Sequence, residues 1–248
     1  MGYKRHQIKS HEKACIFLEK IVKEAFQYIE KNKNCTEYEV QRFILERFNH
    51  YNLKTDKSRT PIVAFGKSTS NVHYYPAKRS SRRLQPNSLI MIDIWARLEK
   101  KGSIFSDITW MAYYGKKAPE EIMKVYNLVI GARDMAIKHI AASLRKGKLP
   151  TGRQADLAAR DTIKQAGHGK RFIHTTGHSL GLNHPHGSYK GLRTDNHRPL
   201  KPDIPYTIEP GVYLKNRFGV RSEINFYISS GLKLKITTKM QKKMVLLA

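Results

Sequence analysis

Two aspartates interrupt the most apolar part of the chain. Asp93 lies within the run Leu89–Trp95. Asp107 lies within Ile104–Thr109, and each run has the length of a β-strand. The polar segment 99–103 between them suits a hairpin turn, so the two carboxylates are expected on neighbouring strands. Close carboxylates in an apolar setting repel unless a cation or a proton lies between them. Two solvated aspartates near strand ends would explain the pair equally well, so further partners must decide.

The second half of the chain carries three more candidate metal ligands. They are His178, Glu209 and Glu223. Alternation along the strand-like segment around Glu223 places Arg221 on the same face as this carboxylate. Each residue alone has a simpler explanation, as a core histidine, a turn carboxylate or the partner of an arginine. Together with the two aspartates they offer four negative charges and one imidazole. That set suits two divalent ions of manganese, cobalt, iron or zinc.

With their neighbours, these residues resemble the pita-bread metallopeptidases, the family of methionine aminopeptidase, Xaa-Pro aminopeptidase and prolidase. The resemblance extends from about Ser10 to the end of the chain. Six motifs carry it in this order: His73 before a tyrosine-rich segment, Ile-Asp-Ile at Asp93, Ser-Asp-Ile-Thr at Asp107, Gly-His-Ser-Leu-Gly-Leu at His178, Ile-Glu-Pro-Gly-Val-Tyr at Glu209 and Gly-Val-Arg-Ser-Glu at Glu223. The resemblance implies an enzyme that hydrolyses the first peptide bond of a peptide substrate with two bound divalent ions.

The resemblance also implies a role for each ligand. Asp93 would chelate one ion, while Asp107 and Glu223 would bridge both. His178 and Glu209 would complete the coordination of the second ion. Glu209 would also transfer protons from the water molecule that bridges the ions. The two aspartates are 14 positions apart, which is longer than is usual in the family. Extra residues in a hairpin turn lengthen its tip and leave the paired strands in place.

Five further residues are implied to contact the substrate or the carboxylates. They are His73, His174, His184, His186 and Arg221. His73 and a second histidine would contact the substrate carbonyl and the tetrahedral intermediate. The family usually places that second histidine seven residues after the metal-binding one, where this chain has a proline between His184 and His186. If this chain has one extra residue between the two histidines of the motif, His186 takes the expected position, and we favour His186 on this ground. His174 and Arg221 match positions of the Xaa-Pro branch.

Both halves of the chain show the same order of predicted elements. Helices are expected over residues 10–33, from 36, over 119–146 and over 151–167, with capping boxes that begin at Thr36 and Thr151. Besides the two aspartate strands, further strands are expected over 61–66, 172–175, 206–208, 220–228 and 232–236. The repeat predicts an α/β (α+β) domain with pseudo-two-fold halves. The resemblance implies the pita-bread fold around a curved antiparallel sheet. One domain is expected over residues 1–248, with a flexible N-terminus over 1–9.

The composition bounds the partners and the location. The chain has 46 lysines and arginines against 20 aspartates and glutamates, a formal net charge of +26. Such an excess can indicate a nucleic-acid or ribosome partner. The basic residues are dispersed, however, and no basic run is interleaved with aromatic residues, so this interpretation has weak support. No signal peptide or membrane-spanning run is visible, and the two cysteines lack metal-ligand spacing. A cytoplasmic protein is therefore expected.

Three classes of function fit the resemblance: a metal-dependent peptidase, a non-catalytic binding protein and an enzyme that works without a metal. The favoured hypothesis is a dinuclear metal-dependent aminopeptidase or dipeptidase of the Xaa-Pro type, because the segments around Glu209 and Arg221 resemble that branch. A methionine aminopeptidase is the nearest alternative. A non-catalytic protein that binds RNA or protein would suit the positive charge, but the five filled ligand positions disfavour it. They equally disfavour creatinase-like chemistry without a metal. The sequence leaves open whether the protein is a monomer or a homodimer.

Overall fold

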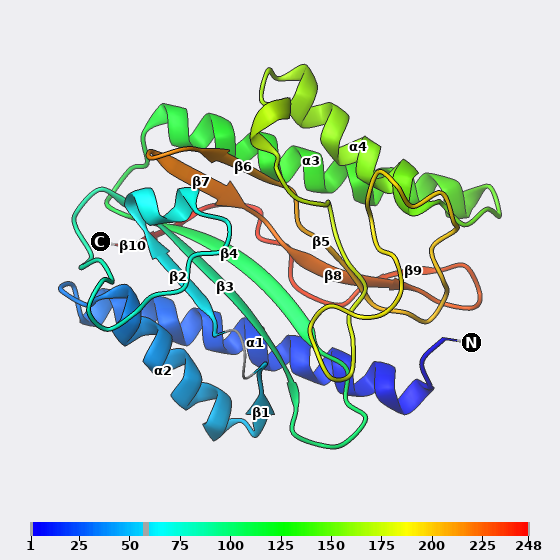
Figure 1. Cartoon of the computed structure of the whole chain (residues 1–248), viewed down its shortest axis with the longest axis horizontal. Coiled ribbons are helices and arrows are strands. Elements are labelled where there is room, and N and C mark those ends of the chain that lie inside the picture. The colour runs from blue at the N-terminus through cyan, green and yellow to red at the C-terminus, as the bar shows by residue number, and fades with distance from the viewer. Residues whose placement is uncertain (1, 57–59, 248) are drawn as a thin grey trace.

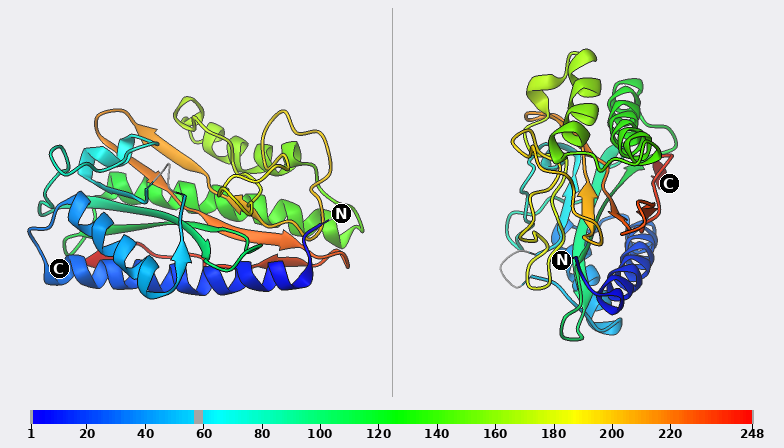
Figure 2. Two further views of the ribbon diagram at one scale, coloured as in Figure 1. Left: turned by 60° about the horizontal axis from the view of Figure 1, so that its bottom comes forward. Right: turned by 90° about the vertical axis from the view of Figure 1, so that its right-hand side faces the viewer.

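The computed structural model describes residues 2–56 and 60–247. Two pairs of helices lie along opposite sides of the molecule, with the strands between them (Figure 1). The first pair is α1 (Arg5–Lys31) and α2 (Glu37–His50), and the second is α3 (Glu120–Arg145) and α4 (Gly152–Gln165). Strands follow each pair, so the predicted repeat of helix, helix and strands is confirmed. Seen end-on, α1 and α3 lie on one side of the strands, with loops on the other (Figure 2).

Two of the helices begin at predicted capping boxes. The hydroxyl of Thr36 accepts the backbone N–H of Glu39 at 3.2 Å, and the Glu39 carboxylate accepts the backbone N–H of Thr36 at 2.7 Å. Thr151 and Gln154 exchange the same two hydrogen bonds at 3.1 and 2.9 Å. Both boxes are therefore confirmed, and each satisfies two backbone groups that the first helical turn would leave unpaired.

The first helix begins earlier than the sequence suggested. It starts at Arg5, so the predicted start at Ser10 was wrong. The side chain of Gln7 accepts the backbone N–H of Lys4 at 2.9 Å and so caps the earlier turn. The backbone N–H of Tyr3 donates to a carbonyl of the second half of the chain at 2.9 Å. The apolar stripe of α1 packs against the main sheet, as its 3.6-residue period predicts.

The strands form three sheets. The main sheet has the order β1–β3–β4–β10, and β2 also pairs with β3. Its strands are β1 (Leu53–Lys54), β2 (Ile62–Phe65), β3 (Ser88–Leu98), β4 (Ser106–Tyr114) and β10 (Val245–Leu247). A second sheet has the order β5 (Tyr206–Ile208), β8 (Ile224–Ile228) and β9 (Leu234–Ile236), and a third pairs β6 (Gly211–Leu214) with β7 (Phe218–Arg221). All pairs are antiparallel except β4 with β10.

Two strand predictions need correction. Residues 172–175 form no strand, because Arg160 of α4 donates to the carbonyls of Phe172 and His174 at 3.1 and 2.9 Å. A side chain thus satisfies backbone acceptors that a strand would offer to a neighbouring strand. The predicted strand 220–228 is interrupted after Arg221 and continues as β8 from Ile224.

The β3–β4 hairpin places its two aspartates on one face. Asp93 pairs with Thr109 and Asp107 pairs with Trp95, so the two carboxylates are diagonal neighbours two residues apart along the ladder. The hairpin itself is as predicted, but the aspartates are not directly opposite each other. Successive strand residues point to opposite faces. Ile94 and its cross-strand partner Ile108 lie between the two aspartates in the ladder and therefore face the core under α1 and α2.

The side chain of Asn225 links the two halves of the molecule at a place where β4 and β8 do not pair as strands of one sheet. β4 and β8 lie side by side but belong to different sheets. The Asn225 side chain accepts the backbone N–H of Asp107 at 3.0 Å and donates to the carbonyl of the same residue at 2.6 Å. It also accepts the hydroxyl of Ser106 at 2.9 Å. One buried amide therefore takes the place of a strand residue beside Asp107.

We expect Asn225→Leu to lower the free energy of unfolding of the metal-free protein by about 2–4 kcal/mol. The shape of the side chain is kept, but buried donors and acceptors of Asp107 and Ser106 lose their partner. Urea unfolding in the presence of a chelator measures the difference. Asn34→Leu at an exposed position is the control and should change the stability by less than about 0.5 kcal/mol. Equal losses in the two variants would contradict this role of Asn225.

Candidate metal centre and active site

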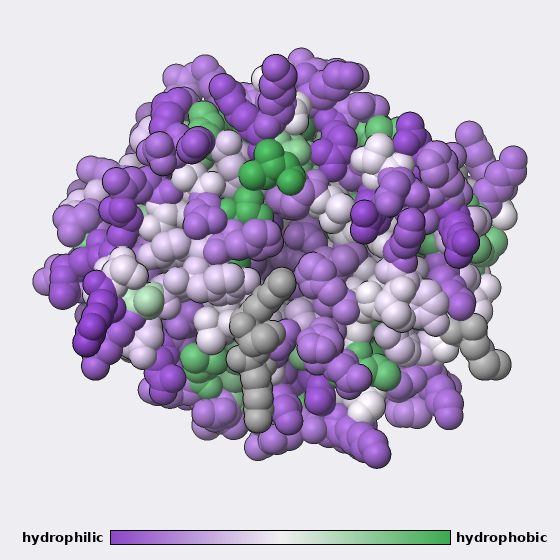
Figure 3. Space-filling view, viewed as in Figure 1, coloured by the Kyte–Doolittle hydropathy of each residue, from purple (hydrophilic) through white to green (hydrophobic). Residues whose placement is uncertain are grey.

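A cavity of about 120 Å³ opens between the two halves of the molecule. Nine of the ten residues predicted as metal ligands or substrate contacts line it, and His184 is the exception. Figure 3 shows that the face of the molecule over the strands is hollowed near its centre and is mostly hydrophilic around the hollow. Residues from distant parts of the chain thus meet at one place, as the sequence predicts.

Two facing breaks in the strands bring the glutamates into the cavity. Glu209 and Pro210 lie between β5 and β6, and Ser222 and Glu223 lie between β7 and β8. The backbone N–H of Ser222 donates to the carbonyl of Pro210 at 3.2 Å, so the two breaks are held against each other. Proline has no N–H to offer a ladder, which suits it to such a break. Both glutamates can therefore leave the strand direction and point into the same space.

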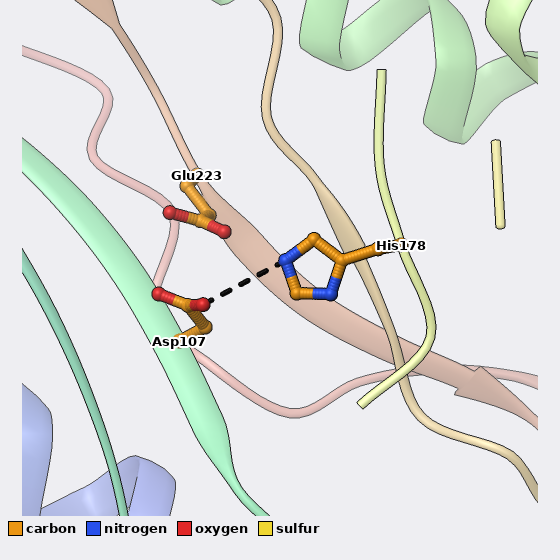
Figure 4. Close-up of side chains that lie close together, drawn as sticks. All are labelled: Asp107, His178 and Glu223. Carbon is orange, nitrogen blue, oxygen red and sulfur yellow. Dashed lines mark ion pairs between the residues drawn. The ribbon is translucent and has the colours of Figure 1, made fainter. Parts of the chain in front are cut away.

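Asp107, His178 and Glu223 form the tightest cluster. One possible ligand atom from each lies within 4.8 Å of the others, and the three side chains point toward one another in Figure 4. His178 Nε2 is 3.7 Å from Oδ2 of Asp107 and 3.4 Å from Oε1 of Glu209. His178 Nδ1 is 3.0 Å from the carbonyl of Ser179 and donates to it. This fixes the neutral tautomer whose Nε2 lone pair faces the carboxylates, the usual state of a metal-ligating histidine.

Arg221 links the carboxylates of the two halves. Its Nη2 pairs with Asp93, and its Nε donates to the hydroxyl of Thr109 at 3.1 Å. The Thr109 hydroxyl donates in turn to Oε2 of Glu223 at 2.8 Å. The guanidinium therefore holds one carboxylate directly and a second through a single hydroxyl. Such fixed donors orient carboxylates for a bound cation.

The cavity has a deficit of positive charge. Arg221 is the only arginine or lysine among its described lining residues, against four carboxylates, of which Asp93, Asp107 and Glu223 are buried and Glu209 is 15% exposed. Burial, and then repulsion from Glu223, raises the pKa of Asp107 well above its ordinary value. Burial, and then repulsion from Glu209, raises the pKa of Glu223 in the same way. Both pKa shifts have the direction expected where burial and neighbouring carboxylates disfavour the ionised form of a carboxyl group.

One carboxylate oxygen marks where a cation fits. Oδ1 of Asp107 is buried and has no hydrogen-bond partner among the described residues. Burial lowers the pKa of His178 to about 4, so the imidazole is neutral near pH 7 and adds no positive charge. Oxygen ligands with one imidazole nitrogen suit divalent transition metals. The residues present therefore fit the divalent ions that the sequence analysis expects.

The four other histidines predicted for the site occupy different surroundings. His73 and His186 line the cavity, and the His186 ring stacks on the His178 ring with centroids 3.9 Å apart. His184 lies outside, with its side chain 68% exposed and its Nδ1 3.3 Å from Oδ2 of Asp56. His174 also lines the cavity, and burial lowers its pKa to about 3, with a further contribution from Arg221. Of the two candidates that the sequence left open, the structure thus brings His186 to the site and not His184.

Several residues of the site escaped the sequence analysis. Thr109 could have been found, because it lies two residues after Asp107 and alternation puts it on the same face. Tyr213 donates its hydroxyl to His174 Nε2 at 2.9 Å, since the other ring nitrogen donates to a carbonyl. Asp156 of α4 accepts the hydroxyl of Thr176 at 2.7 Å and so anchors the segment before the metal-site histidine. No local pattern signals these last two contacts.

The fold and the site define the class of protein, a metallopeptidase. The chain belongs to metallopeptidase family M24, whose model matches residues 9–230. It is 33% identical to an uncharacterized peptidase of Methanocaldococcus jannaschii over 226 residues, which are 88% of this chain and 58% of that protein.

Solved structures agree with this family. A prolidase from Thermococcus sibiricus matches with a TM-score of 0.84 and 28% identity, over 99% of this chain and 62% of that one. A dipeptidase from Pyrococcus horikoshii matches with a TM-score of 0.84 and 27% identity, over 100% and 64%. The pita-bread fold is thereby confirmed. This chain spans less than two thirds of the length of these relatives. Within its described residues, no helix is long and apolar enough to cross a membrane.

We expect the metal-free Asp107→Asn variant to be more stable than the wild type at pH 8. Because the pKa of Asp107 is raised in the folded wild type, this carboxyl group keeps its proton at pH values at which the same group of the unfolded chain has released it. Its stability therefore falls as the pH rises from about 4 through the raised pKa, and the variant lacks this loss. The advantage should be about 1 kcal/mol or more at pH 8 and should vanish below about pH 4.

Urea unfolding over a pH series, with a chelator present, measures this advantage. Asp161→Asn at an exposed position of α4 is the matched control and should show no comparable gain. Addition of Mn²⁺ should reverse the order of wild type and Asp107→Asn, because the ion stabilises only the protein that binds it. Identical pH profiles for wild type and Asp107→Asn would contradict the charge deficit.

Proposed function

We propose that this chain is the catalytic unit of a dinuclear metal-dependent peptidase that removes the first residue of a peptide, with a preference for proline in second place. One observation carries the proposal. Four carboxylates, three of them buried, and the neutral imidazole of His178 converge on a cavity whose described lining contains a single guanidinium, and one buried carboxylate oxygen has no hydrogen-bond partner among the described residues. Family membership supports the peptidase class.

The ligand assignment follows the sequence analysis. Asp93 would hold one ion, Asp107 and Glu223 would be shared between two ions, and His178 with Glu209 would hold the second. The cluster of Asp107, His178 and Glu223 supports the shared positions. Manganese, cobalt, iron and zinc all suit this oxygen-rich set with one nitrogen. The proposed set leaves Arg221 as an outer support, because its donors already engage Asp93 and a threonine hydroxyl.

The chain's own residues would carry the proton transfers. Bound divalent ions supply Lewis acidity, which polarises a carbonyl oxygen and acidifies a water molecule. Burial raises the pKa of Glu209, which suits this carboxylate to accept a proton and to pass it to the leaving amine. The hydroxyl of Thr207 donates to Oε1 of Glu209 at 2.9 Å and leaves the other oxygen for this task. His73 and His186 line the same cavity and would hold the substrate carbonyl.

The preference for proline has separate support. The prolidase of Thermococcus sibiricus has the same fold at 28% identity. Arg221 and His174, the two positions that resemble the Xaa-Pro branch, both face the cavity. A proline nitrogen carries no hydrogen, so a site selective for proline needs no acceptor at that atom. His184 is not part of the proposal, because its side chain points to solvent.

We expect the wild type to bind two divalent ions per chain after reloading with Mn²⁺. Glu223→Gln should bind fewer, with a loss of activity of at least about a hundredfold, since one of the shared ligands loses its charge. Isothermal titration and elemental analysis measure the stoichiometry. Glu30→Gln, at an exposed position of α1, should match the wild type. Activity that persists in protein shown to contain no metal would refute the metal-dependent mechanism.

We expect kcat/KM to be at least about tenfold higher for Ala-Pro-Ala than for Ala-Ala-Ala or Met-Ala-Ser. The comparison is made with Mn²⁺ and, separately, with Co²⁺, and it follows release of the first residue. Because all three peptides have free amines and similar lengths, a difference reports on the second residue and on the first side chain. A preference for Met-Ala-Ser would assign the protein to the methionine aminopeptidase branch. Bound ions without cleavage of any peptide would favour a non-catalytic binding protein.

A further inference from the structure

Arg133 on α3 is fully buried, yet it is absent from the described lining of the site cavity. Its guanidinium reaches the break between β7 and β8 through the hydroxyl of Ser222. Nη1 donates to the hydroxyl of Ser222 at 3.0 Å and to the backbone carbonyl of Gln241 at 2.8 Å. Ser222 is the residue between Arg221 and Glu223. Arg133 therefore hydrogen-bonds to the β7–β8 break at the residue between Arg221 and Glu223.

The charge of Arg133 is only weakly compensated. Its Nε donates to Oδ1 of Asp134 at 2.9 Å, and its Nη2 lies 2.8 Å from the same oxygen. The side chain of Asp134 is half exposed, so water screens much of this attraction. A buried guanidinium with such a partner costs free energy, and an apolar side chain of similar volume would often be as stable or more so. Packing alone therefore gives no reason for an arginine here.

The hydrogen bonds of Arg133 act on the segments that hold the metal ligands. Ser222 is absent from the described lining of the cavity, and its hydroxyl accepts a hydrogen bond from Arg133 of α3. The neighbouring side chains of Arg221 and Glu223 contact Asp93 and Thr109. Gln241, the second acceptor, clamps β4 through two hydrogen bonds to Met111, at 2.9 and 2.6 Å. One guanidinium nitrogen thus ties the β7–β8 break to the segment that is fixed on β4. This strand also carries Asp107, one of the two carboxylates proposed to be shared between the ions.

We propose that Arg133 is a positioning residue of the metal centre. It fixes the backbone at Ser222 and thereby sets the distance and the direction at which Glu223 meets Asp107. The inference rests on the proposed metal site and goes beyond it, because the polar partners of Arg133 are Ser222, Gln241 and Asp134, none of them a proposed ion ligand, and Arg133 is absent from the described lining of the cavity. A shared carboxylate has to satisfy two ions at once, so a small rotation at its backbone weakens both contacts.

The test compares Arg133→Met and Ser222→Ala with the wild type by titration of Mn²⁺ into metal-free protein. Each variant should bind the ions about 10–100-fold more weakly, which is the usual effect of removing a group that orients a ligand. The visible spectrum of the Co²⁺-loaded protein should change in both variants, because the coordination of the shared glutamate changes. The unfolding free energy of metal-free Arg133→Met should be equal to that of the wild type or higher.

The double variant separates positioning from general damage. If the two residues act through their hydrogen bond, Ser222→Ala should cause little further loss of Mn²⁺ affinity in the Arg133→Met protein. Arg47→Met removes a half-buried arginine that pairs with Glu24 on α1, and it should leave Mn²⁺ affinity and the Co²⁺ spectrum unchanged. Ser222→Ala removes a single oxygen atom and is expected to fold. It therefore tests the positioning role even if Arg133→Met fails to fold.

The outcomes distinguish this inference from the proposed function. Wild-type Mn²⁺ affinity and an unchanged Co²⁺ spectrum in Ser222→Ala would overturn the positioning role and leave the metal site intact. Additive losses in the double variant would also overturn it, because they would show that the two residues act independently. A wild type that binds no ion would refute the proposed function and, with it, this role of Arg133.

Discussion

Mutual repulsion among four carboxylates, three of them buried, is the constraint on which the rest of the site depends. Asp93, Asp107, Glu209 and Glu223 face one small cavity, and burial raises the pKa of each of them. A folded protein maintains such an arrangement only if other contacts outweigh the repulsion or a cation removes it. The single guanidinium of the cavity offsets part of the charge, and divalent ions would offset the remainder. Stability and function therefore make opposite demands on the same four side chains.

The supports of the site come from outside it. Asn225 and Gln241 each hold one residue of β4 by its backbone N–H and carbonyl, as a neighbouring strand would. Asp156 anchors the segment before the metal-site histidine, and Arg133 holds the break that precedes Glu223. All four are buried polar side chains from other elements. The strands thus supply the positions of the ligands, and buried side-chain hydrogen bonds replace the ladder where the strands break.

The sequence predicts this site better than it predicts the surroundings of the site. Ligands such as Asp93 stand out because a charge inside an apolar run has few explanations. The choice between His184 and His186 needed the structure, because a tight turn in the backbone decides which ring faces inward. The absent strand at 172–175 could not be foreseen either, since its carbonyls are satisfied by Arg160 from a helix. Contacts between distant elements leave no local pattern to recognise.

The separation of the linked residues along the chain has a consequence for how the protein folds. The hydrogen bond between Thr109 and Glu223 spans 114 positions, and the pair of Arg221 with Asp93 spans 128. Closing loops of this length costs roughly 4–5 kcal/mol of chain entropy before any contact is gained. The helix pairs and the β3–β4 hairpin need only local contacts and can form first. We therefore expect docking of the two halves to be the late step of folding. The repulsion between the carboxylates of the two halves arises only in that step, and ions present during folding would lower its barrier.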